Sequence, residues 1–216
     1  MDRRERLCAR LNPYLMLLYA GFGLVQGIYN VLYGTPYFYW LAFSTALFLA
    51  VPWFLKKVFR LRLGQQLICI YTIFCFLLHM VGLVMRGYYV IPYFDKIAHT
   101  LSGPFCTLAG LALFYVLKPV KKIETSDCGL ASVFSISVSI AIAGLWEISE
   151  YIISLLFGTD PQNVRGTGVG DSMMDMIVCT AGSLLFLISI LLYYRKGKRS
   201  FLMGAFEQFF NLNYEK

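Results

Sequence analysis

The sequence predicts an all-α polytopic membrane protein with six transmembrane helices and both termini in the cytoplasm. Of its 216 residues, 58% are hydrophobic and only 14% are charged, whereas a soluble domain carries about 25% charged residues. Apolar runs of about 18 residues or more recur along the chain, and a helix of that length can cross a bilayer. The Lys and Arg residues gather between these runs, as they do in membrane proteins.

The predicted spans are separated by tight turns and basic segments. Gly34, Thr35 and Pro36 form a turn sequence between the first two apolar runs. Basic stretches follow the second, fourth and sixth runs, and a glycine-rich loop precedes the sixth. The predicted spans are residues 11–32, 37–55, 65–85, 94–117, 131–156 and 172–194.

Particular residues predict how the first two spans pack. Gly23 and Gly27 lie four residues apart, so a neighbouring helix can approach the first span closely. Gln26 and Asn30 in the same span are expected to hydrogen-bond to neighbouring helices. Pro52 is expected to bend or end the second span.

The fourth span has one face of small residues, which predicts tight packing against a neighbour. Pro104 in this span has no N–H to donate, so the carbonyl of Thr100 is expected to be left free beside His99. The small residues are Ala98, Ser102, Cys106 and Gly110.

We expect one transmembrane domain, residues 1–194, followed by a cytoplasmic tail, residues 195–216. The tail is basic at first. Residues 201–212 then carry apolar side chains at a helical spacing, which is typical of a short amphipathic helix lying in the membrane interface. The tail is therefore predicted to be a membrane anchor.

The Lys and Arg residues also predict the orientation, because they are enriched in the cytoplasmic segments of membrane proteins. An even number of spans places both termini on one side. All 19 Lys and Arg residues except Arg86, Lys96 and Arg165 fall on the side of the membrane that holds the termini. Both termini are therefore expected in the cytoplasm, and the loop around Arg165 is expected outside.

Composition disfavours several other classes of protein. The net charge of +7 lies beside the apolar runs, so membrane lipids rather than nucleic acid are the expected partners. The six cysteines form no C-x-x-C pair, and four lie inside apolar runs, so neither disulfides nor a zinc knuckle is expected. The first apolar run has no small-residue cleavage site, which disfavours a cleavable signal peptide. The sequence leaves the oligomeric state open.

Seven ionisable side chains lie in the outer halves of four predicted spans. A charged side chain at the bilayer centre costs about 2.5–3.5 kcal/mol, so such residues are expected to have a function. They are His79, Asp95, His99, Glu147, Glu150, Asp171 and Asp175.

Six of these residues form three pairs, and each pair lies on one face of a helix because its members are three or four residues apart. Charged faces are not expected to point at lipid. We therefore expect the fourth, fifth and sixth spans to be mutual neighbours whose charged faces meet in one cavity. The pairs are Asp95 with His99, Glu147 with Glu150, and Asp171 with Asp175.

Five carboxylates in one cavity need compensation, because like charges oppose each other's ionisation. Protonation, insertion of Lys96 or Arg165, or binding of divalent cations would supply it. Oxygen ligands with one or two imidazoles suit Mg, Mn, Fe or Zn, so all six paired residues are candidate metal ligands. Glu147 and Glu150 are also candidate catalytic residues, and His79 and Arg165 are candidates for the rim.

Structural roles are the alternative for several of these residues. A single buried histidine such as His79 is usually a hydrogen-bonded core residue. Asp95 and Asp171 each begin a span and are also suited to helix N-capping. Glu147 and Glu150 lie well inside a span, so capping does not account for them.

The loop before the sixth span contains Gly166, Gly168 and Gly170. This loop follows no predicted strand and faces outward, so a phosphate-binding loop is not expected. We expect instead a flexible lid over the polar cavity.

Three motifs together resemble those of the YjdF-like family of bacterial inner-membrane proteins. The motifs are Asp95-Lys96-x-x-His99, Glu147-Ile148-x-Glu150 and Asp171-x-x-x-Asp175-Met176, followed by Gly182. Order and spacing agree over about residues 80–190, but Gly170 stands where that family usually has Trp. The Asp-Lys-x-x-His motif also bears a weaker likeness to VanZ-like proteins. The resemblance implies a multi-pass protein of a bacterial inner membrane and supports the six residues as a set, without supplying a reaction.

Three functions are compatible with this polar layer. The first is a metal-dependent hydrolase of a lipid or envelope precursor, with Glu147 or Glu150 as ligand or base. The second is a cation or proton transporter. It is disfavoured because the chain shows no duplicated half and no carboxylate in the inner halves of these spans. The third is a non-catalytic membrane partner whose polar layer only holds the helices together.

Overall fold

The computed structural model describes residues 3–215. The chain is 84% helical and has no strand among these residues. Six helical stretches in the described part are long and apolar enough to cross a membrane, as the sequence predicts. They are Arg3–Tyr33, Pro36–Val58, Gln65–Val84, Phe94–Leu117, Thr125–Phe157 and Gly170–Lys196.

The chain divides into two compact units. The first unit takes residues up to Phe94 and from Gly204 onward, and the second unit takes Asp95–Met203. The expected division into a domain of residues 1–194 and a tail of residues 195–216 stays a prediction.

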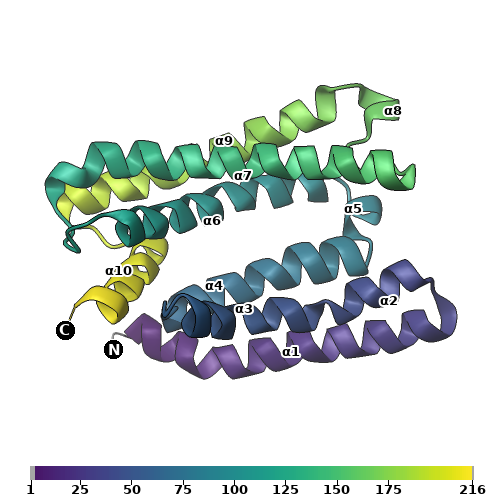
Figure 1. The fold of residues 1–216 in the computed structure, drawn as a ribbon, viewed down its shortest axis with the longest axis horizontal. Coiled ribbons are helices and arrows are strands. Elements are labelled where there is room, and N and C mark those ends of the chain that lie inside the picture. Colours follow the sequence, from purple (N-terminus) through teal and green to yellow (C-terminus); the bar gives the residue numbers. More distant parts are fainter. Residues whose placement is uncertain (1–2, 216) are drawn as a thin grey trace. The chain divides into compact units, whose positions relative to one another are not determined.

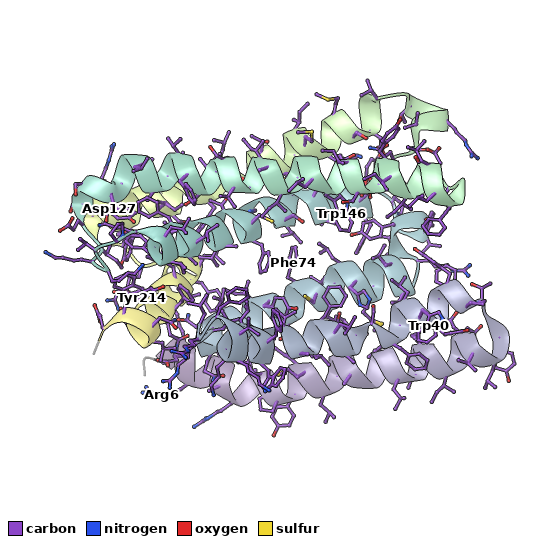
Figure 2. All side chains as sticks on the ribbon, viewed as in Figure 1. Arg6, Trp40, Phe74, Asp127, Trp146 and Tyr214 are labelled. Carbon is purple, nitrogen blue, oxygen red and sulfur yellow. The ribbon has the colours of Figure 1, made fainter. Side chains whose placement is uncertain are left out.

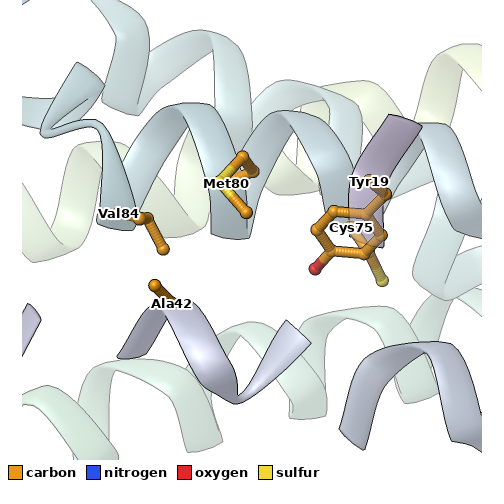
Figure 3. Close-up of a cluster of buried hydrophobic side chains, with 5 residues drawn as sticks. All are labelled: Tyr19, Ala42, Cys75, Met80 and Val84. Carbon is orange, nitrogen blue, oxygen red and sulfur yellow. The ribbon is translucent and has the colours of Figure 1, made fainter. Parts of the chain in front are cut away.

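In the first unit, long helical stretches lie side by side (Figure 1). They enclose a small cluster of buried side chains, formed by Tyr19, Ala42, Cys75, Met80 and Val84 (Figure 3). The elements are α1 (Arg3–Tyr33), α2 (Pro36–Phe43), α3 (Thr45–Val58), α4 (Gln65–Cys75), the π-helix η1 (Phe76–Val84), α5 (Gly87–Val90) and most of α10 (Phe201–Tyr214).

The glycines of α1 allow the close approach that the sequence predicts. A Cβ atom built at Gly23 would lie 2.7 Å from Oγ1 of Thr45, and one at Gly27 would overlap the ring of Phe43. Asn30 was expected to bond a neighbouring helix. Instead it donates from Nδ2 to the carbonyl of Gln26 within α1, at 2.7 Å. This polar pair stabilises the helix itself.

The second span is interrupted at Ser44 rather than at Pro52, where the bend or end was expected. Ser44 separates α2 from α3 and donates from Oγ to the carbonyl of Leu41 at 2.7 Å. Helix α3 continues through Pro52 because the carbonyl that this proline leaves without a donor, that of Phe48, accepts a hydrogen bond from the Tyr71 hydroxyl at 2.8 Å.

The predicted C-terminal helix is present as α10. Its polar residues hold the start of α4 and the segment before it. Gln208 Oε1 accepts from the backbone N–H of Gln66, in the first turn of α4, at 3.1 Å. Asn213 Oδ1 also accepts from the N–H of Arg62 at 2.8 Å. Five apolar residues of α10 are buried in the protein, whereas Phe201 and Leu212 are exposed, and the position of this helix at the membrane interface stays a prediction. The buried residues are Met203, Ala205, Phe206, Phe209 and Phe210.

The second unit contains three long helices and two short ones. The long helices correspond to the fourth, fifth and sixth predicted spans, with each end within three residues of the expected bound. The elements are α6 (Phe94–Leu117), η2 (Thr125–Asp127), α7 (Cys128–Phe157), α8 (Val164–Thr167) and α9 (Gly170–Lys196).

Helices α6 and α9 cross at a pair of glycines. A Cβ atom built at Gly103 would overlap the carbonyl oxygen of Cys179, and one at Gly182 would overlap the carbonyl oxygen of Thr100. The Thr100 carbonyl is the one that Pro104 deprives of its helical donor. The freed carbonyl therefore packs against the backbone of α9.

Helix α7 joins this crossing through small polar residues. Ser139 Oγ lies 3.2 Å from the carbonyl of Gly103 on α6 and 2.9 Å from Ser183 Oγ on α9. A Cβ atom built at Gly110, on the predicted small face of α6, would lie 2.8 Å from the carbonyl of Ser135. The three helices are therefore mutual neighbours, as the sequence predicts.

A hydrogen-bond network ties the same helices together near the start of α7. Asp127 accepts from the Tyr115 hydroxyl at 2.8 Å and from Lys118 Nζ at 2.8 Å to both carboxylate oxygens. The hydroxyls of Tyr115 and Tyr194 lie 2.6 Å apart. Figure 2 shows that Asp127 lies far from Trp146, which marks the part of α7 near the predicted site.

Candidate functional site

The centre of the site is the ammonium group of Lys96, at the start of α6. Its Nζ lies 2.6 Å from Asp171 Oδ1, 2.7 Å from Asp175 Oδ1 and 3.0 Å from Asp95 Oδ2. Asp171 and Asp175 lie one turn apart on α9, so Lys96 ties the beginning of α6 to the beginning of α9. The sequence allowed protonation, a basic side chain or a cation to compensate the negative charge. The structure contains one of these, the inserted side chain of Lys96.

His99 lies one helical turn after Asp95 and faces the same carboxylates. Its Nε2 is 3.5 Å from Asp95 Oδ1 and 3.9 Å from Asp175 Oδ1. Asp95, His99 and Asp175 each offer one ligand atom, and these three atoms lie within 4.8 Å of one another. We call Asp95, Lys96, His99, Asp171 and Asp175 the acidic cluster.

Glu147 belongs to α7 and is buried, with 7% of its surface exposed. Gln162, in the loop after α7, donates from Nε2 to the Glu147 carbonyl at 3.0 Å and to Glu147 Oε2 at 3.3 Å. Glu147 Oε1 has no hydrogen-bond partner among the described residues. Glu147 is not among the three residues whose ligand atoms lie within 4.8 Å of one another.

Glu150 lies one turn further along α7 and is partly buried. Its Oε1 accepts a hydrogen bond from Trp146 Nε1 at 3.0 Å. The structure thus brings the pairs Asp95/His99 and Asp171/Asp175 together at Lys96, and Glu147 and Glu150 lie on α7 of the same unit. The binding of a metal by these residues stays a prediction.

His79, a candidate for the rim, lies in the first unit with hydrogen-bond partners of its own. Its Nε2 is 3.0 Å from the carbonyl of Leu41 and 2.9 Å from Ser44 Oγ, and Nδ1 is 2.8 Å from the Tyr19 hydroxyl. Because a carbonyl can only accept, Nε2 carries a proton in this arrangement. His79 is buried within the π-helix η1, and these contacts fit the alternative of a hydrogen-bonded core histidine.

Arg165, the other candidate for the rim, is exposed on α8. Its guanidinium group donates to the carbonyl of Gly158 at 3.2 Å. Its backbone N–H donates to Asp160 Oδ2 at 3.0 Å, and the N–H of Val164 donates to Asp160 Oδ1 at 2.9 Å. The loop therefore has internal hydrogen bonds, and Arg165 contributes to its shape; its role as a flexible lid stays a prediction.

The charges and donors of the site fit a divalent cation. Lys96 compensates one of the five carboxylates, so a strong negative charge remains unless protons or cations reduce it. Two carboxylates and one imidazole form a donor set of the kind that binds Mg, Mn, Fe or Zn. The unpaired Glu147 Oε1 supports this fit, because a buried oxygen without a partner is costly.

Sequence reasoning missed Gln162 and Trp146, which hold the two glutamates. Trp146 lies four residues before Glu150, a helical spacing at which side chains meet, so this contact could have been found. Gln162 carried no comparable signal, because its contact with Glu147 depends on the path of a loop.

Comparisons with known proteins identify a family but no activity. No curated protein and no solved structure matches the chain. The model of one family of predicted membrane proteins, DUF2238, matches residues 13–196, which take in most of the first span, the other five spans and the whole acidic cluster. The chain therefore belongs to this family of predicted membrane proteins.

Proposed function

We propose that the acidic cluster binds a divalent cation and that the protein is a metal-dependent hydrolase of a lipid-linked or envelope precursor. The observation that carries this proposal is the approach of the Asp95, His99 and Asp175 ligand atoms to within 4.8 Å of one another. Mg, Mn, Fe and Zn are the metals that suit these donors.

A bound cation of this kind would supply Lewis acidity to the substrate and to water. The residues of the chain supply the remaining chemistry. Glu147 Oε1 is a buried oxygen without a hydrogen-bond partner among the described residues and is available as a further ligand, which leaves Glu150 as the candidate base. Lys96 contacts Asp171 at 2.6 Å, and its ammonium group would bind an anionic group of the substrate, such as a phosphate, if Asp95 and Asp175 held the cation.

The other functions have less support from the structure. A transporter must expose its site to both sides, yet the carboxylate near the start of α7, Asp127, is satisfied by Lys118 and Tyr115. A polar layer that only joins helices gains nothing from the unpaired oxygen of Glu147. Both observations favour a site that opens at one side.

We also propose that the protein resides in the inner membrane of a bacterium. The resemblance to the YjdF-like family supports this location, and that likeness is carried by the motifs of the acidic cluster together with Glu147 and Glu150. The distribution of Lys and Arg residues supports an orientation with the cluster in the outer half of the bilayer.

Metal analysis of the purified protein in lipid nanodiscs tests this function. We expect stoichiometric metal in the wild-type protein or saturable Mn²⁺ binding measured by electron paramagnetic resonance. Asp175→Asn and Glu150→Gln should weaken binding about tenfold or more, because each removes a charge at the site. Glu124→Gln, which changes a carboxylate outside the site, serves as control.

Hydrolysis is tested on the same samples with para-nitrophenyl phosphate and para-nitrophenyl esters as probes. We expect turnover that requires the metal and is lost in Asp175→Asn. A wild-type protein that binds no divalent cation at millimolar concentration would refute the proposed function.

A further inference from the structure

The chain turns back sharply after α7. Gly158 ends this helix in the left-handed conformation, with φ of 65°. Gln162 follows only four residues later, yet its side chain bonds Glu147, which precedes Gly158 by eleven residues. Glu147 lies about 16 Å below Gly158 along the helix axis, at about 1.5 Å per residue.

The segment from Gly158 to Gln162 is short compared with this distance. Four residues of fully extended chain span at most about 14 Å, and the glutamine side chain supplies the remaining reach. Residues 159–163, which we call the return segment, therefore run back along α7, and they include a turn in which the Asn163 N–H donates to the Asp160 carbonyl at 3.1 Å. Irregular backbone at this depth is tolerated where protein or a polar cavity covers it, and Pro161 and Gln162 are partly buried.

The far end of the return segment is also fixed. Asp160 accepts hydrogen bonds from the backbone N–H groups of Val164 and Arg165, at 2.9 and 3.0 Å. These bonds hold the turn that leads into α8 and from there to α9. Gln162 thus fastens this turn to Glu147 of α7, in addition to the contact of Arg165 with the Gly158 carbonyl.

We propose that Gln162 is a positioning residue for Glu147 and the fastening of the return segment. Its amide occupies the Glu147 carbonyl and Oε2, which leaves Oε1 for a cation held beside His99. The fastening needs no cation, whereas the role of Oε1 rests on the proposed function. The hydrogen bonds from Gln162 and the cation would both act on the Glu147 carboxylate. Cation binding and attachment of the return segment to α7 would therefore stabilise each other.

Hydrogen–deuterium exchange of residues 158–169 in nanodiscs, with and without Mn²⁺, tests the inference together with Mn²⁺ affinity. Gln162→Ala removes both hydrogen bonds, so we expect exchange about tenfold faster without Mn²⁺ and Mn²⁺ binding about tenfold weaker. Thr159→Ala, at an exposed position of the same loop, should change neither quantity.

Two further variants separate positioning from a merely structural role. Glu147→Gln keeps an acceptor oxygen for Gln162, so exchange should stay slow while Mn²⁺ binding weakens. Gln162→Lys keeps a donor to Glu147 but adds a positive charge, so exchange should again stay slow while Mn²⁺ binding weakens. Retention of slow exchange in both variants supports a fastening through the hydrogen bonds to Glu147.

The outcomes distinguish this inference from the proposed function. If the wild-type protein binds no Mn²⁺, the proposed function fails, and faster exchange in Gln162→Ala alone still supports the fastening. If Gln162→Ala exchanges at the wild-type rate, the fastening is refuted whether or not Mn²⁺ binds. If its exchange accelerates while its Mn²⁺ affinity equals that of the wild type, the positioning of Glu147 is refuted.

Discussion

Lys96 holds three carboxylates, and its side chain is only 26% exposed. Lys96→Met should therefore lower the free energy of unfolding by about 2 kcal/mol, because it leaves Asp171 and Asp175 without their counter-ion. Lys96→Arg keeps the charge and should cost less. Thermal unfolding in nanodiscs measures both effects, and equal stability of the Met variant and the wild type would contradict this reading of the cluster.

The same substitution bears on cation binding. Lys96 contacts Asp95 and Asp175, which are also candidate ligands. Removing its charge should raise Mn²⁺ affinity, and added Mn²⁺ should recover more stability in Lys96→Met than in the wild type. Unchanged or lower Mn²⁺ affinity in the Met variant would show that Lys96 does not compete with the cation.

At the scale of single residues, helical spacing predicted much of the site. The pairs Asp95/His99 and Asp171/Asp175 were predictable because residues four apart share a helix face. Lys96 and Arg165 were the two candidates for the basic residue that compensates the carboxylates. The sequence could not decide between them, because it does not show the direction of a long flexible side chain. The partners of His79 come from two other helices and had no local signal.

Among the helical elements, the crossing of α6 and α9 leaves no room for a side chain. Gly103→Ala and Gly182→Ala should each destabilise the protein by about 1–3 kcal/mol, because each added methyl group would overlap a backbone carbonyl. Gly129→Ala is the matched control, since a Cβ atom there meets nothing within 4 Å. Unfolding by heat in nanodiscs should rank the three variants, and a neutral Gly182→Ala would contradict the crossing.

The extent of each span was predictable from hydropathy, because apolar runs of this length have few other uses. The interruption at Ser44 was not predictable, and neither was the continuity of α3 through Pro52. That continuity depends on the Tyr71 hydroxyl, which reaches the Phe48 carbonyl from a different helix. Similarly, the π-helix η1 has no sequence signature, and it was expected as part of an ordinary span.

For the whole molecule, the orientation in the membrane is the prediction on which the depth of the site depends. Single cysteines at Thr167 and Lys122, in a background without native cysteines, should report it in intact cells. A membrane-impermeant maleimide should label Thr167→Cys from outside and leave Lys122→Cys unlabelled until the membrane is opened. The reverse pattern would place the acidic cluster at the cytoplasmic side.

The hydrogen bonds within the second unit also limit which part of α7 can move. Helices α6, α7 and α9 are joined at two levels, by the network around Asp127 and by the contacts of Ser139. Beyond Ser139, the arm of α7 that carries Glu147 is eight residues or about 12 Å long. Tilting this arm by about 10° would move Glu147 by about 2 Å, which is the difference between a direct ligand and one separated by water. If the proposed cation is bound, small changes in the tilt of this arm would therefore decide whether Glu147 contacts it directly.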